Sequence, residues 1–174
     1  VSADIDPRHL GEEMWGGPGG LRTARGEEIG ARPQSQNFAV WWDGDLLREL
    51  LDANRVMKWD WLTGKTNNLF VAEGASSNNG SKSTPALSVD LFGDWREEVI
   101  LRTSDNKALR IYTTTIPTEY RITTLMHDPQ YRAAIAWQNV SYNQPPHPGF
   151  YLGEGMKFPA PRTPIAVPPR RSGL

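Results

Sequence analysis

The sequence contains no cysteine, so it can form neither a disulfide framework nor a cysteine-ligated zinc site. No run approaches the ~20 apolar residues of a membrane-spanning helix. The formal net charge is −1, which leaves no electrostatic footprint for nucleic acid. Neither a nucleophile elbow nor a phosphate-binding loop is present. We therefore expect neither nucleic acid nor a membrane as a partner.

Aromatic residues, glycine and proline are all plentiful in this chain. It has seven Trp, five Tyr and five Phe, together with sixteen Gly and fourteen Pro among 174 residues. Such a composition is typical of short strands joined by many turns, as in sandwiches, barrels and propellers. The length is sufficient for one hydrophobic core. The composition therefore predicts an all-β fold.

Alternating or β-rich segments mark the expected strands. They are 37–42, 46–51, 56–61, 67–72, 99–103, 108–115 and 120–126. The segment 131–137 fits a short helix or a strand, and we favour a strand. Three polar segments, 16–36, 74–85 and 138–149, are expected to be loops, and after Gly153 we expect a Pro-rich tail without regular structure.

An acidic turn followed by an apolar strand recurs along the chain. In S-V-D-L-F-G-D-W-R-E-E-V-I-L-R (88–102), Gly93 allows the chain to bend between the carboxylates. The segment 2–15 repeats the aspartate pair and the glutamate pair, and 41–51 is a looser third copy. Carboxylates crowded at one turn repel each other unless a cation lies among them, and Ca²⁺ suits an all-oxygen site. Repeats at intervals of roughly 40–45 residues are typical of propeller blades. The alternative is an Asp-rich surface turn without metal.

Two of the polar loops carry groups that suit an acidic sugar. The first contains Asn78, Asn79 and Lys82; the other contains Asn139, Tyr142, Asn143, Gln144 and His147. Amides and a phenol can bind sugar hydroxyls, and a lysine can pair with a carboxylate. The competing interpretation is that both are ordinary solvated loops.

His127-Asp128-Pro129 has two interpretations. The pair could be catalytic or bind a metal. A histidine followed by an aspartate at a strand end is more often part of a structural turn, and we favour the turn. A retaining glycosidase would need two facing carboxylates, whereas the acidic residues here lie in the repeated turns.

Five motifs together resemble bacterial rhamnogalacturonan lyases of the calcium-dependent, eight-bladed propeller family. They are W-W-D-G-D-L-L-R-E-L-L-D (41–52), L-F-G-D-W-R-E-E-V-I-L-R-T (91–103), L-R-I-Y-T-T-T (109–115), T-L-M-H-D-P-Q-Y-R (124–132) and Y-N-Q-P-P-H (142–147). The resemblance runs from residue 1 to about residue 156 and covers the C-terminal part of such an enzyme, about three of its eight blades. It implies two parts, the blades (1–156) and a Pro-rich tail (157–174).

The resemblance implies calcium-assisted β-elimination in the backbone of rhamnogalacturonan I, an acidic plant cell-wall polysaccharide. Lys82 falls where the family places an active-site lysine, and Tyr142 where it places a tyrosine. Arg8 is the candidate for an expected arginine. Predicted substrate-binding residues are Asn78, Asn79, Asn143 and His147. Predicted calcium ligands are Asp4, Asp6, Asp90, Asp94, Asn139 and, through its carbonyl, Ser141.

A second hypothesis is a non-catalytic module, because calcium-stabilised propeller blades also serve as interaction surfaces for carbohydrate or protein. Lys82 and the Y-N-Q-P-P-H loop favour the lyase. The remaining blades, or another chain, are expected as partners, since a partial propeller leaves strand edges open. The family resemblance implies a secreted protein. The chain begins with Val and shows no signal-like segment, so we expect a processed or truncated product.

Overall fold

The computed structural model describes residues 1–138, 140, 143–160, 162 and 164, and it consists mainly of three antiparallel sheets. The first sheet contains β1 (Ser2–Ala3), β2 (Glu13–Met14), β3 (Leu21–Arg22) and β4 (Glu28–Gly30) in sequence order. The second contains β5 (Phe38–Val40), β6 (Glu49–Asp52), β7 (Arg55–Asp60) and β8 (Lys65–Val71). The third has the order β10 (Leu87–Val89), β11 (Glu98–Thr103) and β12 (Leu109–Tyr112), and β9 (Ala75–Ser76) pairs with the far end of β11.

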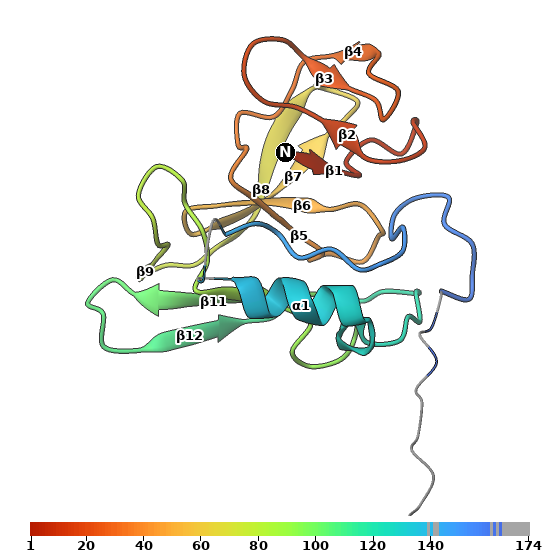
Figure 1. Ribbon diagram of the computed structural model, residues 1–174. Helices are drawn as coiled ribbons and strands as arrows, with labels where there is room; N and C mark the ends of the chain where they lie inside the picture. Colours follow the sequence, from red (N-terminus) through yellow and green to blue (C-terminus); the bar gives the residue numbers. More distant parts are fainter. Residues whose placement is uncertain (139, 141–142, 161, 163, 165–174) are drawn as a thin grey trace, which may run out of the picture.

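The sheets follow one another from top to bottom in Figure 1, in the order of the sequence. Short apolar strands with both faces buried explain this stacking, because alternate side chains of a strand point to opposite faces. Phe38 and Val40 of β5 pack with Val99 and Leu101 of the third sheet. Ala39, between them, packs with residues of the first sheet. The all-β expectation is therefore confirmed, and no sheet in the described part of the chain closes on itself.

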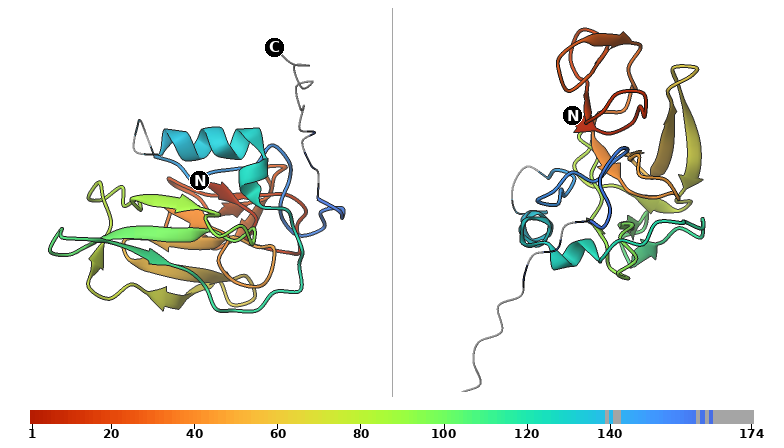
Figure 2. Two further views of the ribbon diagram at one scale, coloured as in Figure 1. Left: turned by 90° about the horizontal axis from the view of Figure 1, so that it is seen from below. Right: turned by 90° about the vertical axis from the view of Figure 1, so that its right-hand side faces the viewer.

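A C-terminal layer covers the edge of the third sheet. It contains a single 3₁₀ turn, η1 (Leu125–His127), and one helix, α1 (Pro129–Trp137). The Gln138 amide, just after α1, accepts from the backbone N–H of Ser88 at 2.9 Å and donates to the Ser88 carbonyl at 2.6 Å, so it pairs with the edge of β10 as a further strand would. Both views of Figure 2 show the helix on one side of the sheets. No helix among the described residues is long and apolar enough to span a membrane.

Several expected elements differ in the structure. The segment 131–137 is helical, not a strand: the Asp128 carboxylate accepts from the backbone N–H of Tyr131 at 2.9 Å, and Pro129 occupies the first turn. The segment 120–126 is not a strand either. Residues 120–124 pair with no sheet, and the chain then enters η1. Within the expected loop 16–36 lie β3 and β4. The expected strand 46–51 begins at Glu49, because Leu46 and Leu47 belong to the turn before it.

Candidate functional site

Each sheet has a corner built around one buried glutamate. Glu13, Glu49 and Glu98 begin the second strands and pair with Ala3, Val40 and Val89 of the first strands. Each places one carboxylate oxygen under the turn between the two strands, where it accepts two consecutive backbone N–H groups. The bonds come from Ile5 and Asp6 at 3.0 Å each, Trp42 and Asp43 at 2.9 and 3.1 Å, and Leu91 and Phe92 at 2.9 and 3.1 Å.

The second oxygen of this glutamate has a different partner in each sheet. In the second sheet, Oε1 of Glu49 accepts from the Lys58 ammonium at 2.8 Å, and in the third, Oε1 of Glu98 accepts from the Thr113 hydroxyl at 2.9 Å. In the first sheet, Oε1 of Glu13 is buried and has no hydrogen-bond partner among the described residues. The same is true of Oδ1 of Asp4. A buried carboxylate oxygen without a donor is costly, and the Arg8 guanidinium of this turn pairs with Asp6 instead.

The pKa values of Asp4 and Glu13 reflect the missing hydrogen-bond donors at the first corner. Burial raises the pKa of Glu13 to about 7, although the N–H groups of Ile5 and Asp6 oppose the shift. Burial likewise raises the pKa of Asp4 to about 6, although the Tyr151 hydroxyl and the Glu154 N–H donate to its other oxygen. A cation nearby would favour the ionised form of both carboxylates.

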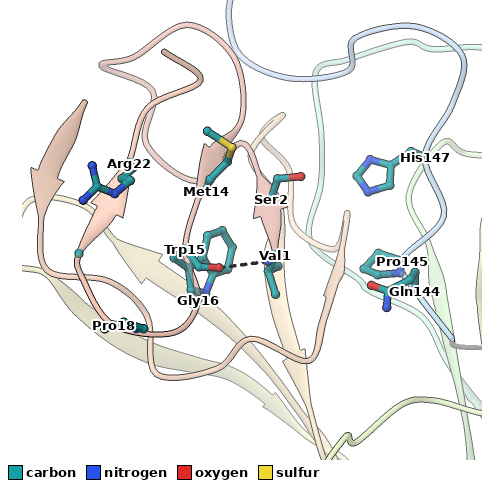
Figure 3. Close-up of a pocket in the computed structure, with 11 residues that line it drawn as sticks. Val1, Ser2, Met14, Trp15, Gly16, Pro18, Arg22, Gln144, Pro145 and His147 are labelled. Atoms are coloured by element: carbon teal, nitrogen blue, oxygen red, sulfur yellow. Dashed lines mark hydrogen bonds between the residues drawn. The ribbon is translucent and has the colours of Figure 1, made fainter. Parts of the chain in front are cut away.

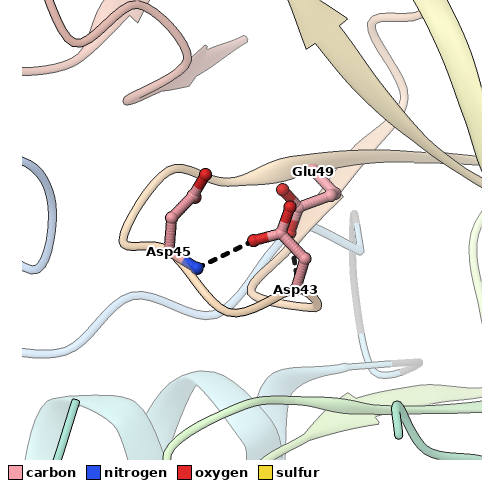
Figure 4. A group of neighbouring side chains, drawn as sticks. All are labelled: Asp43, Asp45 and Glu49. Atoms are coloured by element: carbon pink, nitrogen blue, oxygen red, sulfur yellow. Dashed lines mark hydrogen bonds between the residues drawn. The ribbon is translucent and has the colours of Figure 1, made fainter. Parts of the chain in front are cut away.

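The second corner gathers three carboxylates, from Asp43, Asp45 and Glu49, whose oxygens lie within 4.8 Å of one another (Figure 4). Among the described residues they are the only such group of metal-ligand type. The Lys58 ammonium, however, lies 2.5 Å from Asp43, 2.6 Å from Asp45 and 2.8 Å from Glu49. Burial disfavours this charge, but the three carboxylates raise the pKa of Lys58 above its usual value. The cation at this corner is therefore a side chain.

The predicted metal ligands at the other turns bind protein groups. Asp6 and Asp94 form ion pairs of 2.6 Å with Arg8 and Arg96. One Asp90 oxygen accepts from the Thr124 hydroxyl and the Leu125 N–H at 2.7 Å each, and the other accepts from the Gly93 N–H at 2.8 Å. Asn139 and Ser141 lie outside the described residues.

Lys82 lies in a compact hairpin-like loop between β9 and β10. Asn78 and Thr84 exchange backbone hydrogen bonds, and the Asn79 amide donates to the Thr84 hydroxyl at 2.9 Å, so the loop is held by its own polar groups. The Lys82 ammonium donates to the carbonyl of Asn37, just before β5, at 2.8 Å. Burial lowers the pKa of Lys82, and the Asp52 carboxylate opposes that shift. Lys82 is thus a partly buried amine at the start of the second sheet.

The structure does not bring Arg8 to Lys82. Arg8 lies in the turn between β1 and β2, whose end of the molecule is opposite to the loop between β9 and β10 in Figure 1. Its guanidinium pairs with Asp6, donates to the Trp61 carbonyl at 3.2 Å and lies 4.9 Å from the centre of the Trp61 ring. Through these contacts, Arg8 stabilises the turn in which it lies.

The segment 143–147 carries two further predicted residues. Asn143 is only 4% exposed, and neither atom of its amide has a hydrogen-bond partner among the described residues. His147 and Gln144 line a cavity of about 660 Å³ that is walled on the opposite side by the first sheet, including Trp15 and Arg22 (Figure 3). A second cavity, of about 640 Å³, lies between the same segment and α1. Tyr142 lies outside the described residues.

His127-Asp128-Pro129 is a structural turn. Oδ1 of Asp128 accepts from the N–H groups of Tyr131 at 2.9 Å and Gly149 at 3.0 Å. It therefore both starts α1 and fastens the segment after Pro148 to the helix. The structural interpretation favoured from the sequence is confirmed.

Known proteins match this chain over nearly its whole length. The family model described as "Rhamnogalacturonan lyase family 11, C-terminal domain" matches residues 1–162. The chain belongs to this family. The relatives include the rhamnogalacturonan endolyase YesW of Bacillus subtilis, 61% identical over 157 residues, and the rhamnogalacturonan exolyase YesX of the same organism, 53% identical over 176 residues. These matches cover 90% and 91% of this chain but 25% and 29% of the relatives.

Solved structures agree with the family assignment. The crystal structure of YesW superposes with a TM-score of 0.87, and a rhamnogalacturonan lyase of Bacillus licheniformis, 61% identical, superposes with a TM-score of 0.88. Each match covers about nine-tenths of this chain and 27% of the other chain. The chain thus spans about a quarter of the length of these family 11 lyases.

Sequence reasoning missed several residues that organise this family 11 domain. The corner glutamates gave a signal, since each copy of the repeat ends on a glutamate before an apolar strand. Lys58 gave none, because it reaches the corner from the third strand of its sheet. Arg48 also gave none, although it is buried and pairs with Glu97 of the next sheet at 3.2 Å.

Proposed function

We propose that this chain is the C-terminal portion of a polysaccharide lyase that cleaves the rhamnose–galacturonate backbone of rhamnogalacturonan I by β-elimination. The observation that carries the proposal is the family 11 match over residues 1–162, with an endolyase and an exolyase as relatives. The names of these relatives support lyase activity, rhamnogalacturonan as the substrate and a role in pectin degradation.

The reaction needs a base and a positive group at one galacturonate. The base removes the proton at C5, the electron pair forms the C4=C5 double bond, and the sugar oxygen at C4 leaves. The charge that develops next to the carboxylate must be stabilised by a cation. We assign this chemistry to Lys82 and Tyr142, whose sequence positions match the family's lysine and tyrosine. The lowered pKa of Lys82 supports a proton-accepting role, because it raises the fraction of neutral amine.

His147 and Gln144 are proposed to contact the polysaccharide, because both line the cavity against the first sheet. Asn78, Asn79 and Asn143 are assigned a supporting role: the Asn79 amide holds the Lys82 loop, and Asn143 is buried beside the Tyr142 position. Arg8 is assigned to its own turn, since its guanidinium is engaged by Asp6 and Trp61.

The three sheets are proposed to be successive blades of a propeller. Two backbone hydrogen bonds support this: the N–H of Arg48 donates to the carbonyl of Asp4, and the N–H of Glu97 donates to the carbonyl of Trp41, each at 2.8 Å. The donors precede equivalent glutamates, and the acceptors follow equivalent first strands. The first sheet therefore joins the second as the second joins the third, and a repeated relation of this kind generates a radial array.

Calcium is proposed at the first corner. Oδ1 of Asp4 and Oε1 of Glu13 are buried without donors and fit a cation. A bound Ca²⁺ would supply the positive charge that Lys58 supplies at the second corner. The described surroundings of Asp6, Asp90 and Asp94 fit less well, because protein donors already occupy their oxygens. Asn139 and Ser141 remain proposed ligands beside Tyr142, and a secreted location is proposed by analogy with the substrate.

The lyase reaction is tested by mixing the chain with rhamnogalacturonan I and following the ultraviolet absorbance of the unsaturated uronate, with and without chelator. The same assay on a chimera, in which this chain replaces the matching segment of YesW, supplies the rest of the enzyme. We expect the chimera to produce unsaturated product. If the chimera folds and binds the polysaccharide without any rise in absorbance, the non-catalytic module is the better account.

A further inference from the structure

The residue before each corner glutamate is charged in all three sheets. The residue just before each corner glutamate is Glu12 in the first sheet, Arg48 in the second and Glu97 in the third. The guanidinium of Arg48 is 1% exposed, and both it and the Glu12 carboxylate lie within 3.5 Å of the His147 ring. Its Nη2 is 3.2 Å from Oε2 of Glu97, which is fully buried. The ring of Trp41 lies 3.9 Å away and covers the guanidinium.

The same guanidinium holds the segment 143–147. Nη2 of Arg48 donates to the carbonyls of Ala39 and Pro146 at 3.2 Å each. Nη1 lies 3.3 Å from Nε2 and 3.5 Å from Nδ1 of His147. One side chain thus connects the first strand of the second sheet, the third sheet and the segment 143–147.

The contacts of His147 define a tautomer. Arginine can only donate hydrogen bonds, and Nη1 of Arg48 lies within 3.5 Å of both ring nitrogens, so the Arg48 contact alone selects neither tautomer. Nδ1 lies 3.5 Å from Oε1 of Glu12, which can only accept while it is ionised. A neutral imidazole with its proton on Nδ1 satisfies both neighbours.

This ring stands at the boundary of two cavities. His147, Gln144 and Pro145 line both the cavity against the first sheet and the cavity beside α1. Arg48 lines neither of them. Any effect of Arg48 on a sugar bound there must therefore pass through the Pro146 carbonyl and the His147 ring.

We propose that Arg48 is a positioning residue that fixes His147, with its proton on Nδ1, in the shared wall of the carbohydrate site. The role of the wall in carbohydrate binding rests on the proposed function, whereas the placement of the ring does not. Arginine suits this position because its planar fork spans several acceptors, whereas a lysine ammonium is a single point charge. Arg48→Lys would keep a charge for Glu97 but could not also hold the Pro146 carbonyl and the imidazole.

The test uses the 174-residue chain and three variants. Arg48→Lys removes the fork, and Glu12→Gln, at a half-exposed site, exchanges the ionised acceptor for an amide. Arg96→Lys is the matched control, because Arg96 also pairs with a carboxylate and a backbone carbonyl at a sheet corner, but its partners Asp94 and Ile116 line neither cavity. The measurements are the ¹⁵N side-chain spectrum of His147, the melting temperature and binding of rhamnogalacturonan I oligosaccharides.

We expect the wild type and Arg96→Lys to show a single Nδ1–H tautomer. Arg48→Lys and Glu12→Gln should show a mixture of tautomers, and Arg48→Lys should weaken oligosaccharide binding at least tenfold more than Arg96→Lys does. An unchanged His147 spectrum in Arg48→Lys and Glu12→Gln would overturn the proposal, as would equal weakening by both arginine variants. Should the wild type and the YesW chimera both fail to bind oligosaccharide, the proposed function fails, and the His147 spectrum still decides whether Arg48 positions the ring.

Discussion

Lys58 and Glu49 form an ion pair in which the ammonium lies 2.8 Å from a carboxylate that is completely buried. The same ammonium is shared with Asp43 and Asp45, so one lysine supplies the positive charge at a copy of the acidic turn whose pattern suggested a cation. The three sheets therefore repeat one backbone arrangement, but the second oxygen of the buried glutamate has a different environment in each sheet.

Replacing this lysine tests the arrangement at the second corner. Lys58→Met leaves Glu49 buried without its positive partner, and we expect the free energy of unfolding to fall by about 3 kcal/mol, as when one member of a buried pair is removed. Urea unfolding in the presence of chelator measures the change. Lys65→Met, on the exposed end of β8, is the control and should cost less than about 0.5 kcal/mol. Equal stability of the two variants would contradict the assignment.

At the first corner, we expect the stabilisation by calcium to depend on pH. The pKa of Asp4 is raised to about 6 and that of Glu13 to about 7, so the folded state holds protons that the unfolded chain has released. In chelator, the contribution of these groups to stability is full below about pH 4 and is lost as the pH rises to about 7. Added calcium should then raise the melting temperature, and more so at pH 7 than at pH 5.

Glu13→Gln identifies the source of this effect. The amide oxygen can still accept from the N–H groups of Ile5 and Asp6, but the carboxylate is gone, so the calcium-dependent rise should shrink. Glu98→Gln is the matched control, because Thr113 already serves its second oxygen. A calcium-dependent rise that is the same in both variants would place the ion elsewhere.

We expect substitutions of Asp128 to lower stability without lowering the activity of the folded protein. Asp128→Ala removes the bonds from Tyr131 and Gly149, and we expect a loss of about 1–2 kcal/mol in the free energy of unfolding. Asp128→Asn, which keeps an acceptor oxygen, should lose much less. Activity per folded molecule of the YesW chimera should stay at the wild-type value in both variants. A selective loss of turnover in a stable Asp128→Asn protein would instead indicate a catalytic group.

The sequence was sufficient for most strands of the second and third sheets and for the acidic corners, because both are local patterns. β5 and β12 lie within the segments expected for them, β7 and β11 begin one residue before theirs, and Gly93 has a φ of 81°, as its turn requires. Helix α1 was missed although Asp128 and Pro129 are helix-start signals, because the short apolar segment after them also fits a strand.

The charge partners at the corners could not be predicted in the same way. Lys58 reaches Glu49 from another strand, and Arg48 meets Glu97 and His147 at separations of 49 and 99 residues along the chain. No local pattern encodes such contacts. The described residues do not bring the predicted catalytic groups together: Lys82 lies beside Asn37, Arg8 lies beside Trp61, and Tyr142 lies outside the described residues.

The most direct measurement is lyase activity of the YesW chimera with Lys82→Ala, beside a control with Lys107→Ala. Lys107 is a matched surface lysine whose side chain is 82% exposed. We predict that Lys82→Ala loses at least about 100-fold of the unsaturated-product rate, the usual scale for a proton-transfer group, with little change in melting temperature, whereas Lys107→Ala keeps the full rate. Wild-type turnover by folded Lys82→Ala chimera would contradict the account.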